Sequence, residues 1–476
     1  MGKIVARNPF RLCALAALAA LGPGIVWGQT PGRFTAIGNM TTPRYGHTAT
    51  LLADSRVLIT GGRDVHNEML SSAELYDPST GMFTSTGSMV LPRYHSNNTL
   101  LRDGRVLIVG GTGLPGGVAN AELYDPATGT FSLTGNITPP QFLYGPTLLN
   151  SGEVLVLVQG GSVEFTLTPP TRAELYDPVS GAFTATGNGS WDWSATSATL
   201  LTDGTVLIAG GPDTQGIFRA GQLYDPVSGT FTPVGNGTTL CYWNTATLLT
   251  NGNVLLAGGG QDDIGIALAS AALFNPVSAK FIPTGDMITA RLGHTATLLP
   301  DGTVFVAGGY AWASLLNSAE RYDPFTGAFT AAGNLTTGRA LHTATLLDNG
   351  MVLLAGGSDS TWQATASAEL YNPSLLMPAL VITFDRTNVA VGTSYFVSVS
   401  GSNLTSQTFF DIRFKAPGSN AYDVALNWQR SLAAGHEVSA GTAIGGWTIN
   451  GVRPHQGEAD HTGGFVPVSA TIAVSP

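Results

Sequence analysis

The sequence is poor in residue types on which whole classes of protein depend. Its 476 residues include only 2 cysteines, and charged residues make up 11%, with 21 Lys and Arg against 31 Asp and Glu. So low a charged fraction excludes a coiled coil, a helical bundle and a polyelectrolyte tail. The formal net charge of -10 argues against nucleic acid as a partner, because that binding draws most of its affinity from clustered Lys and Arg.

Long hydrophobic runs are also scarce. The Ala/Leu-rich run at residues 12–21 is too short to span a bilayer, and basic residues precede it while a small-residue stretch follows. Residues 1–28 therefore have the pattern of a signal peptide, so we expect export to the periplasm, the cell surface or the exterior, and no membrane span. After cleavage one cysteine, Cys241, would remain, so stability must come from packing rather than from an intramolecular disulfide.

Glycine and proline are abundant, with 61 and 27 residues, and they mark a repeat. In each unit a Thr-Leu-Leu segment, a tight turn and an apolar run ending in Gly-Gly precede a Tyr/Phe-Asp/Asn-Pro triplet, and the period is about 49 residues. The triplets begin at Tyr76, Tyr124, Tyr176, Tyr224, Phe274, Tyr322 and Tyr371.

The segments of each unit predict four short strands and no helix, because they are rich in β-branched and aromatic residues and are bounded by Gly, Pro, Asn and Asp. Seven such units predict an all-β fold, a seven-bladed β-propeller over residues 29–374. The Thr-Ala-Thr segment should lie innermost, where only small side chains fit. The Gly-Gly pair should follow at a turn that needs positive φ.

The two ends of the repeat region have complementary defects. The last unit lacks its fourth strand, while an orphan Gly-Arg-Phe-Thr stands at residues 32–35, before the first complete set. We expect residues 33–37 to supply the outer strand of the last blade, because pairing the two ends removes an open sheet edge.

The repeat resembles the kelch repeat, with Phe where many members have Trp, over residues 32–374. The resemblance implies a propeller but no single activity, because kelch-type propellers include protein-binding modules, secreted sugar-handling proteins, a sialic-acid mutarotase and copper-radical oxidases. Residues 379–476 break the period and alternate apolar and polar residues, which predicts a small β-sandwich. That part resembles an immunoglobulin-like domain of the IPT/TIG type, and an end cap or spacer is one role we expect for it.

Motifs for metal or nucleophilic chemistry are lacking: the sequence has no HExxH, paired CxxC, EF-hand loop or Gly-x-Ser-x-Gly. Copper-radical oxidases use a Tyr-His pair, a Tyr cross-linked to Cys and a His from the C-terminal domain. Tyr94-His95 and Cys241-Tyr242 resemble parts of that set. However, the Tyr-His pair lies in the second unit instead of the last. Adjacent residues of a strand also point to opposite faces, which argues against a cross-link between Cys241 and Tyr242. We predict no catalytic residue, no metal ligand and no cofactor, with copper only if the chain is such an oxidase.

Alignment of the repeats with one another gives the candidate site. Arginine recurs before four Thr-Leu-Leu segments, where it could serve the blade or contact a ligand, and aromatic residues replace the pattern elsewhere. All these positions lie on loops that share one face with the loops after Gly-Gly, which hold Arg63, Trp312 and Trp362. The candidate ligand-binding residues are Trp191, Trp193, Tyr242, Trp243, Tyr94, His95, Arg44, Arg93, Arg291 and Arg339.

Aromatic side chains beside charged groups can stack on sugar rings, and they can equally well bind a side chain of a protein partner. We therefore expect an exported, non-enzymatic propeller that binds a carbohydrate or protein ligand. The alternative is a carbohydrate-active enzyme of the copper-radical or acid/base type.

Overall fold

The computed structural model describes residues 32–112, 119–137, 142–159, 172–189, 197–209, 221–235, 244–260, 266–312 and 314–373, and the backbone of the strands β31 to β38. The chain divides into two compact units, of which the larger is Pro31–Leu375. The described residues are strands and their connections, with no helix, so none of them offers a helix long and apolar enough to cross a membrane.

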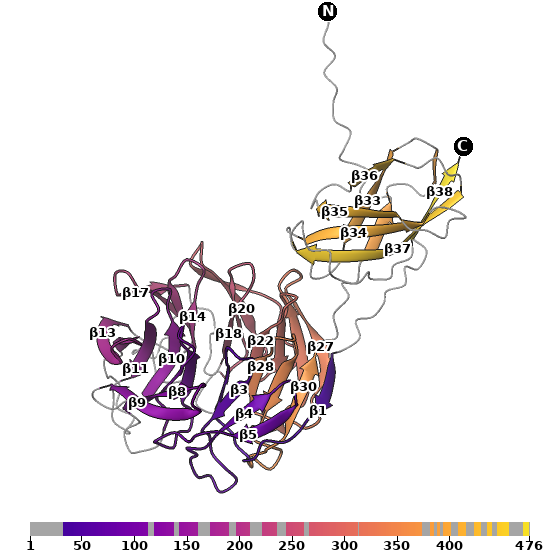
Figure 1. Cartoon of the computed structure of the whole chain (residues 1–476). Coiled ribbons are helices and arrows are strands. Elements are labelled where there is room, and N and C mark those ends of the chain that lie inside the picture. The colour runs from indigo at the N-terminus through magenta and orange to yellow at the C-terminus, as the bar shows by residue number, and fades with distance from the viewer. Residues whose placement is uncertain are drawn as a thin grey trace, which may run out of the picture. The chain divides into compact units, whose positions relative to one another are not determined.

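The larger unit consists of seven four-stranded antiparallel sheets, as the repeat predicts (Figure 1). We number these blades by their order in the sequence. The innermost strands are β2 (Thr48–Leu51), β6 (Asn97–Leu100), β10 (Phe142–Leu148), β14 (Ser197–Leu200), β18 (Thr245–Leu248), β22 (Thr295–Leu298) and β28 (Thr343–Leu346). The second strands are β3 (Val57–Thr60), β7 (Val106–Val109), β11 (Val154–Gln159), β15 (Val206–Ala209), β19 (Val254–Ala257), β23 (Val304–Ala307) and β29 (Val352–Ala355).

The triplet lies at the end of the third strand of each blade. These strands are β4 (Ala73–Asp77), β8 (Asn120–Asp125), β12 (Arg172–Asp177), β16 (Gly221–Asp225), β20 (Ala271–Asn275), β26 (Ser318–Asp323) and β30 (Ala368–Asn372). The outer strands are β5 (Met82–Ser85), β9 (Thr130–Asn136), β13 (Ala182–Asn188), β17 (Thr230–Val234), β21 (Lys280–Pro283), β27 (Ala328–Asn334) and β1 (Arg33–Ala36). A small hairpin of β24 (Tyr310–Ala311) and β25 (Ser314–Leu315) extends the sixth blade.

The innermost strands form a closed ring. Each contacts the innermost strands of its two neighbours, in the order β2, β6, β10, β14, β18, β22 and β28, and β28 meets β2 again. The Thr-Ala-Thr segments lie in this ring, which confirms the placement predicted from their small side chains. The second strands are fully buried, so the core lies between the blades.

The orphan strand closes the propeller. β1 pairs antiparallel with β30, with Arg33 opposite Asn372 and Ala36 opposite Glu369, and Figure 1 shows indigo β1 beside orange β30. Phe34 packs on Tyr371 at a ring distance of 4.9 Å. The first strand of the propeller therefore completes its last blade, as the complementary ends predict.

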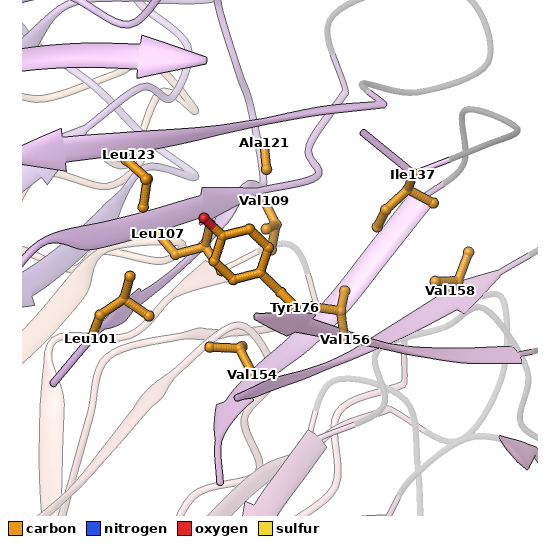
Figure 2. Close-up of a cluster of buried hydrophobic side chains, with 10 residues drawn as sticks. All are labelled: Leu101, Leu107, Val109, Ala121, Leu123, Ile137, Val154, Val156, Val158 and Tyr176. Carbon is orange, nitrogen blue, oxygen red and sulfur yellow. The ribbon is translucent and has the colours of Figure 1, made fainter. Parts of the chain in front are cut away.

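The tyrosine of the repeat joins neighbouring blades. Tyr176 of the third blade lies among Leu107 and Val109 of the second and Val154 of its own (Figure 2). Its hydroxyl is 2.8 Å from the Thr134 hydroxyl on the preceding outer strand, and the same bond recurs between three other pairs of blades. The tyrosine thus buries its ring and still satisfies its polar end.

The Gly-Gly pair is required by close backbone approach. Gly61 and Gly62 have φ of 67° and 95°. A Cβ on Gly62 would lie 2.8 Å from the carbonyl oxygen of Tyr45, and one on Gly61 would lie 2.5 Å from that of Arg93, on the next blade. The pair therefore allows the second strand to turn against two neighbouring loops.

The C-terminal strands form a three-stranded and a five-stranded sheet, with the orders β31-β33-β36 and β32-β38-β37-β34-β35. Their bounds are β31 (Val381–Phe384), β32 (Asn388–Ala390), β33 (Ser394–Ser400), β34 (Thr408–Lys415), β35 (Asp423–Gln429), β36 (His436–Ser439), β37 (Gly445–Gln456) and β38 (Ala470–Ser475). These strands agree with the all-β expectation, and the immunoglobulin-like assignment stays a prediction.

Candidate ligand-binding site on the loop face

One face of the propeller carries two kinds of loop, and we call it the loop face. Lead-in loops run from the outer strand of one blade into the inner strand of the next, and second loops follow the Gly-Gly pairs. Because strands alternate in direction, the turns after the inner and third strands lie on the opposite face. The described residues of the predicted site, which are Tyr94, His95, Arg44, Arg93, Arg291 and Arg339, belong to the loop face.

Four blades carry a buried ion pair beneath their loops. In each pair the N–O distance is 2.6 to 2.9 Å, and neither side chain is more than 2% exposed. The pairs are Arg44–Glu74, Arg93–Glu122, Arg291–Glu320 and Arg339–Glu369, in the first, second, sixth and seventh blades.

Through hydrogen bonds, each pair links the lead-in loop and the second loop of its blade to the third strand. In the first blade Arg44 donates to the carbonyl oxygen of Gly61 at 2.8 Å, while Glu74 accepts from the backbone N–H groups of Thr41 and Thr42 at 2.6 and 3.0 Å. Equivalent bonds recur in the other three blades. A surface ligand cannot reach a buried guanidinium. The ligand-contact role considered for Arg44, Arg93, Arg291 and Arg339 is therefore corrected to a structural one.

The recurring histidines join neighbouring blades. The Nε2 atoms of His47, His294 and His342 each lie 3.1 Å from a threonine hydroxyl at the start of the preceding inner strand. Burial, together with the nearby arginine charge, lowers the pKa of His47 and His294 to about 3 and that of His342 well below its usual range. These rings are therefore neutral at physiological pH.

Backbone hydrogen bonds link the lead-in loops of the same four blades. The N–H of Leu341 donates to Gly293 at 3.1 Å, that of Gly46 to Leu341 at 2.9 Å, and that of His95 to Gly46 at 3.0 Å. All four residues have φ between 54° and 62°. A residue with a Cβ adopts this conformation at a cost on the order of 1 kcal/mol, and such strain gathers at functional sites. His95 and Leu341 are thus informative positions.

Tyr94 and Arg63 form the centre of a polar and aromatic group on the first two blades. The Tyr94 ring covers Gly46, where a side chain would collide with it. The guanidinium of Arg63 lies 4.5 Å from the centre of that ring, and Tyr45 meets it edge-on at 5.5 Å. The Tyr45 hydroxyl and Arg63 Nη1 both donate to Asn67 Oδ1, at 2.6 and 2.9 Å.

The protonation states in this group follow from the surrounding protein. Desolvation, helped by the neighbouring tyrosines Tyr45 and Tyr310, raises the pKa of Tyr94 to about 12. The His95 side chain is exposed, yet the surrounding protein desolvates it, and together with the Arg63 charge this lowers its pKa to about 4. At neutral pH both groups are uncharged, so Arg63 carries the positive charge here.

Aromatic residues continue this group on the sixth and seventh blades. Tyr310 stands where Arg63 stands in the first blade, immediately after the Gly-Gly pair, and its ring lies over Gly293. Trp362 meets the Tyr310 ring edge-on at 5.2 Å. Trp312 and Trp362 are 77% and 42% exposed, and their φ values are 51° and 60°.

The fold does not require tryptophan at the position of Trp362. Asp64 and Asp359 make the same backbone bonds in the second loops of the first and seventh blades, and Asn67 occupies the position of Trp362 with φ of 63°. Asn adopts this conformation readily, whereas a bulky residue there is an outlier. We call the whole group the loop-face cluster, and it consists of Tyr45, Arg63, Tyr94, His95, Tyr310, Trp312 and Trp362.

Comparison with known proteins agrees with this architecture. A model of the kelch motif matches residues 291–336, which run from Arg291 through all four strands of the sixth blade. The chain therefore contains a kelch motif within its seven-bladed β-propeller. A search of curated proteins by sequence found no match.

One solved structure similar to this kelch propeller is a fungal alcohol oxidase of the AA5 family in complex with copper. The TM-score is 0.63 and the identity 16%, and the match covers 94% of this chain and 100% of that chain. At this identity the likeness shows the shared fold.

The structure brings only some of the predicted residues of the kelch propeller together. Tyr94 and His95 belong to the loop-face cluster, whereas Trp191, Trp193, Tyr242 and Trp243 lie outside the described residues. The list of candidate ligand-binding residues omitted five members of the cluster. Arg63, Trp312 and Trp362 were named only as residues of the loops after Gly-Gly, and Tyr45 and Tyr310 were not named. Their signal was available in the repeat alignment, because Tyr45 aligns with Tyr94 and Tyr310 aligns with Arg63.

Proposed function

We propose that this kelch propeller is an exported protein that binds a carbohydrate through the loop-face cluster. The observation that carries the proposal is the exposure of Trp312 and Trp362 in a strained backbone conformation beside Tyr310. Exposed tryptophans at such positions cost the fold free energy. Their aromatic faces suit the apolar faces of sugar rings, whose hydroxyls then reach polar groups such as His95.

The framework beneath the cluster supports the proposal. The four blades that hold the Arg–Glu pairs are the ones whose loops carry the cluster. Binding sites need their contact residues held by supporting side chains, because an ordered site loses less entropy on binding. Trp191, Trp193, Tyr242 and Trp243 occupy corresponding lead-in loops in the sequence, and we include them as candidates for an extension of the site.

The experiment replaces both exposed tryptophans with asparagine, the residue that the first blade has at the position of Trp362. Trp312→Asn with Trp362→Asn removes the rings while keeping a residue that tolerates the backbone. For a polysaccharide that binds the unaltered protein, we expect the affinity to fall roughly 30-fold or more, because each ring contributes about 1 kcal/mol of binding free energy. The melting midpoint should not change. Phe325→Ala is the matched control, because Phe325 is 57% exposed on the opposite face.

The result separates three cases. Loss of binding in the tryptophan variant alone supports the proposal. Equal loss in the Phe325 control, or retention of a protein from the native host instead of any polysaccharide, contradicts it. A collapse of stability in the tryptophan variant would assign the rings to the fold.

A copper-radical oxidase is the second candidate, favoured by the fold likeness to the AA5 enzyme. The described side chains do not fit copper: they contain no group of three or more His, Cys, Asp and Glu that could hold a metal ion. The Arg63 charge beside Tyr94 opposes a metal cation, and His47, His294 and His342 already bond to threonines. We therefore derive no copper chemistry, and the alternative is tested by the metal analysis described below.

A further inference from the structure

Arg63 is a cation for which the described part of the chain provides no counter-charge. Its Nη1 donates to the neutral amide oxygen of Asn67, its face lies over Tyr94, and its Nε is buried without a hydrogen-bond partner. Among the described side chains, no carboxylate lies within ion-pair distance of it, whereas the arginines of the four buried Arg–Glu pairs each have one. An arginine with unused donors in a partly desolvated place calls for a partner from outside.

We propose that Arg63 forms an anion subsite of the loop-face cluster and that the saccharide bound there carries a carboxylate, as uronic acids do. This inference rests on the proposed carbohydrate function. It adds the chemical class of the ligand, which the aromatic rings alone do not select.

The geometry around Arg63 favours a planar anion. Contact with Tyr94 covers one face of the guanidinium and Asn67 accepts one N–H of Nη1, which fixes the plane, and because Nε is buried the edge open to an outside acceptor is the one formed by Nη1 and Nη2. A guanidinium edge matches a carboxylate by two parallel hydrogen bonds. The tilt of the plane is set before binding, so little side-chain entropy is lost when the anion arrives.

The position of Arg63 also suits a sugar chain. Arg63 and Trp362 lie on corresponding loops of adjacent blades, since the seventh blade is joined to the first. One sugar unit can stack on a ring while a carboxylate of the same or the next unit meets Arg63. The whole chain has a formal net charge of -10, so long-range forces repel polyanions and selection must come from contact.

The test compares acidic polysaccharides with their own neutral forms. Pectate, alginate and hyaluronan would be offered beside carboxyl-reduced preparations of each, in which uronic acids have become neutral sugars, and beside a sulfated galactan. We expect at least tenfold tighter binding of one acidic polymer than of its reduced form, weakening as salt is raised. Arg63→Gln should remove that difference. Arg102→Gln, which deletes an exposed positive charge on the opposite face, should preserve it.

The failures are distinguishable. If a reduced form binds as tightly as its acid, the anion subsite is refuted while the carbohydrate function stands. Tighter binding of the sulfated galactan than of every uronate would refute the carboxylate assignment. If no polysaccharide binds, the proposed function itself fails. The comparison of acid with reduced form on the unaltered protein needs no variant, so a folding defect in Arg63→Gln does not affect it.

Discussion

The ion pair between Arg44 and Glu74 gives the sharpest test of how the loop face is held. Glu74 is 1% exposed and accepts from Thr41, Thr42 and Arg44 at 2.6, 3.0 and 2.8 Å. Glu74→Gln keeps the shape, but it leaves the Arg44 charge buried without a counter-charge and turns an acceptor into a donor facing other donors. Breaking a buried pair in this way costs about 3 to 5 kcal/mol of unfolding free energy.

The first blade offers a matched control. Arg56 and Asp54 also form an ion pair, but they are 34% and 44% exposed, and such pairs contribute about 0 to 1 kcal/mol. Urea unfolding followed by tryptophan fluorescence should therefore show a large loss for Glu74→Gln and a small one for Asp54→Asn. Hydrogen exchange of the Thr41 and Thr42 amides should accelerate only in the first variant. Equal losses in the two variants would refute the idea that this pair holds the loops.

Three further predictions follow from the structure. A chain that starts at residue 40 lacks β1 and leaves the edge of β30 unpaired, so it should melt well below the longer chain or aggregate, and an unchanged melting midpoint would contradict the closure. His47 and His294 have a pKa of about 3 in the folded protein against an ordinary 6.5, so the unfolded chain binds more protons in between, and stability should fall as pH drops from about 6.5 toward 3. His294→Gln should flatten that slope whereas exposed His66→Gln should not, and identical slopes in urea unfolding would count against it. The purified protein should hold no stoichiometric copper by elemental analysis, and peroxide release from a primary alcohol by copper-loaded protein, abolished by Tyr94→Phe, would overturn this.

The repeat by itself determined the number of blades, the order of strands and the closure. Four strands per unit and a fixed period leave a propeller as the way to bury every apolar second strand. The missing strand at one end and the extra Gly-Arg-Phe-Thr at the other are local sequence facts, so the pairing of β1 with β30 followed from them without coordinates. The small residues of the inner strands and the Gly-Gly turns were predictable for the same reason, since each reflects a steric demand repeated in every blade.

Only the tertiary structure decided which recurring residues are buried in the blades and which belong to the loop-face cluster. Arg44 and Arg63 are both arginines on the loop face, and sequence alone could not tell that one has a buried carboxylate partner 30 residues away while the other has none among the described residues. Burial and the presence of a counter-charge arise from packing between segments, which no local pattern records. The cluster itself joins residues far apart in the chain, because ring closure brings Gly46 within hydrogen-bond distance of Leu341. The loop-face cluster lies where the last blades meet the first ones, so its composition followed from the folded ring rather than from any single repeat.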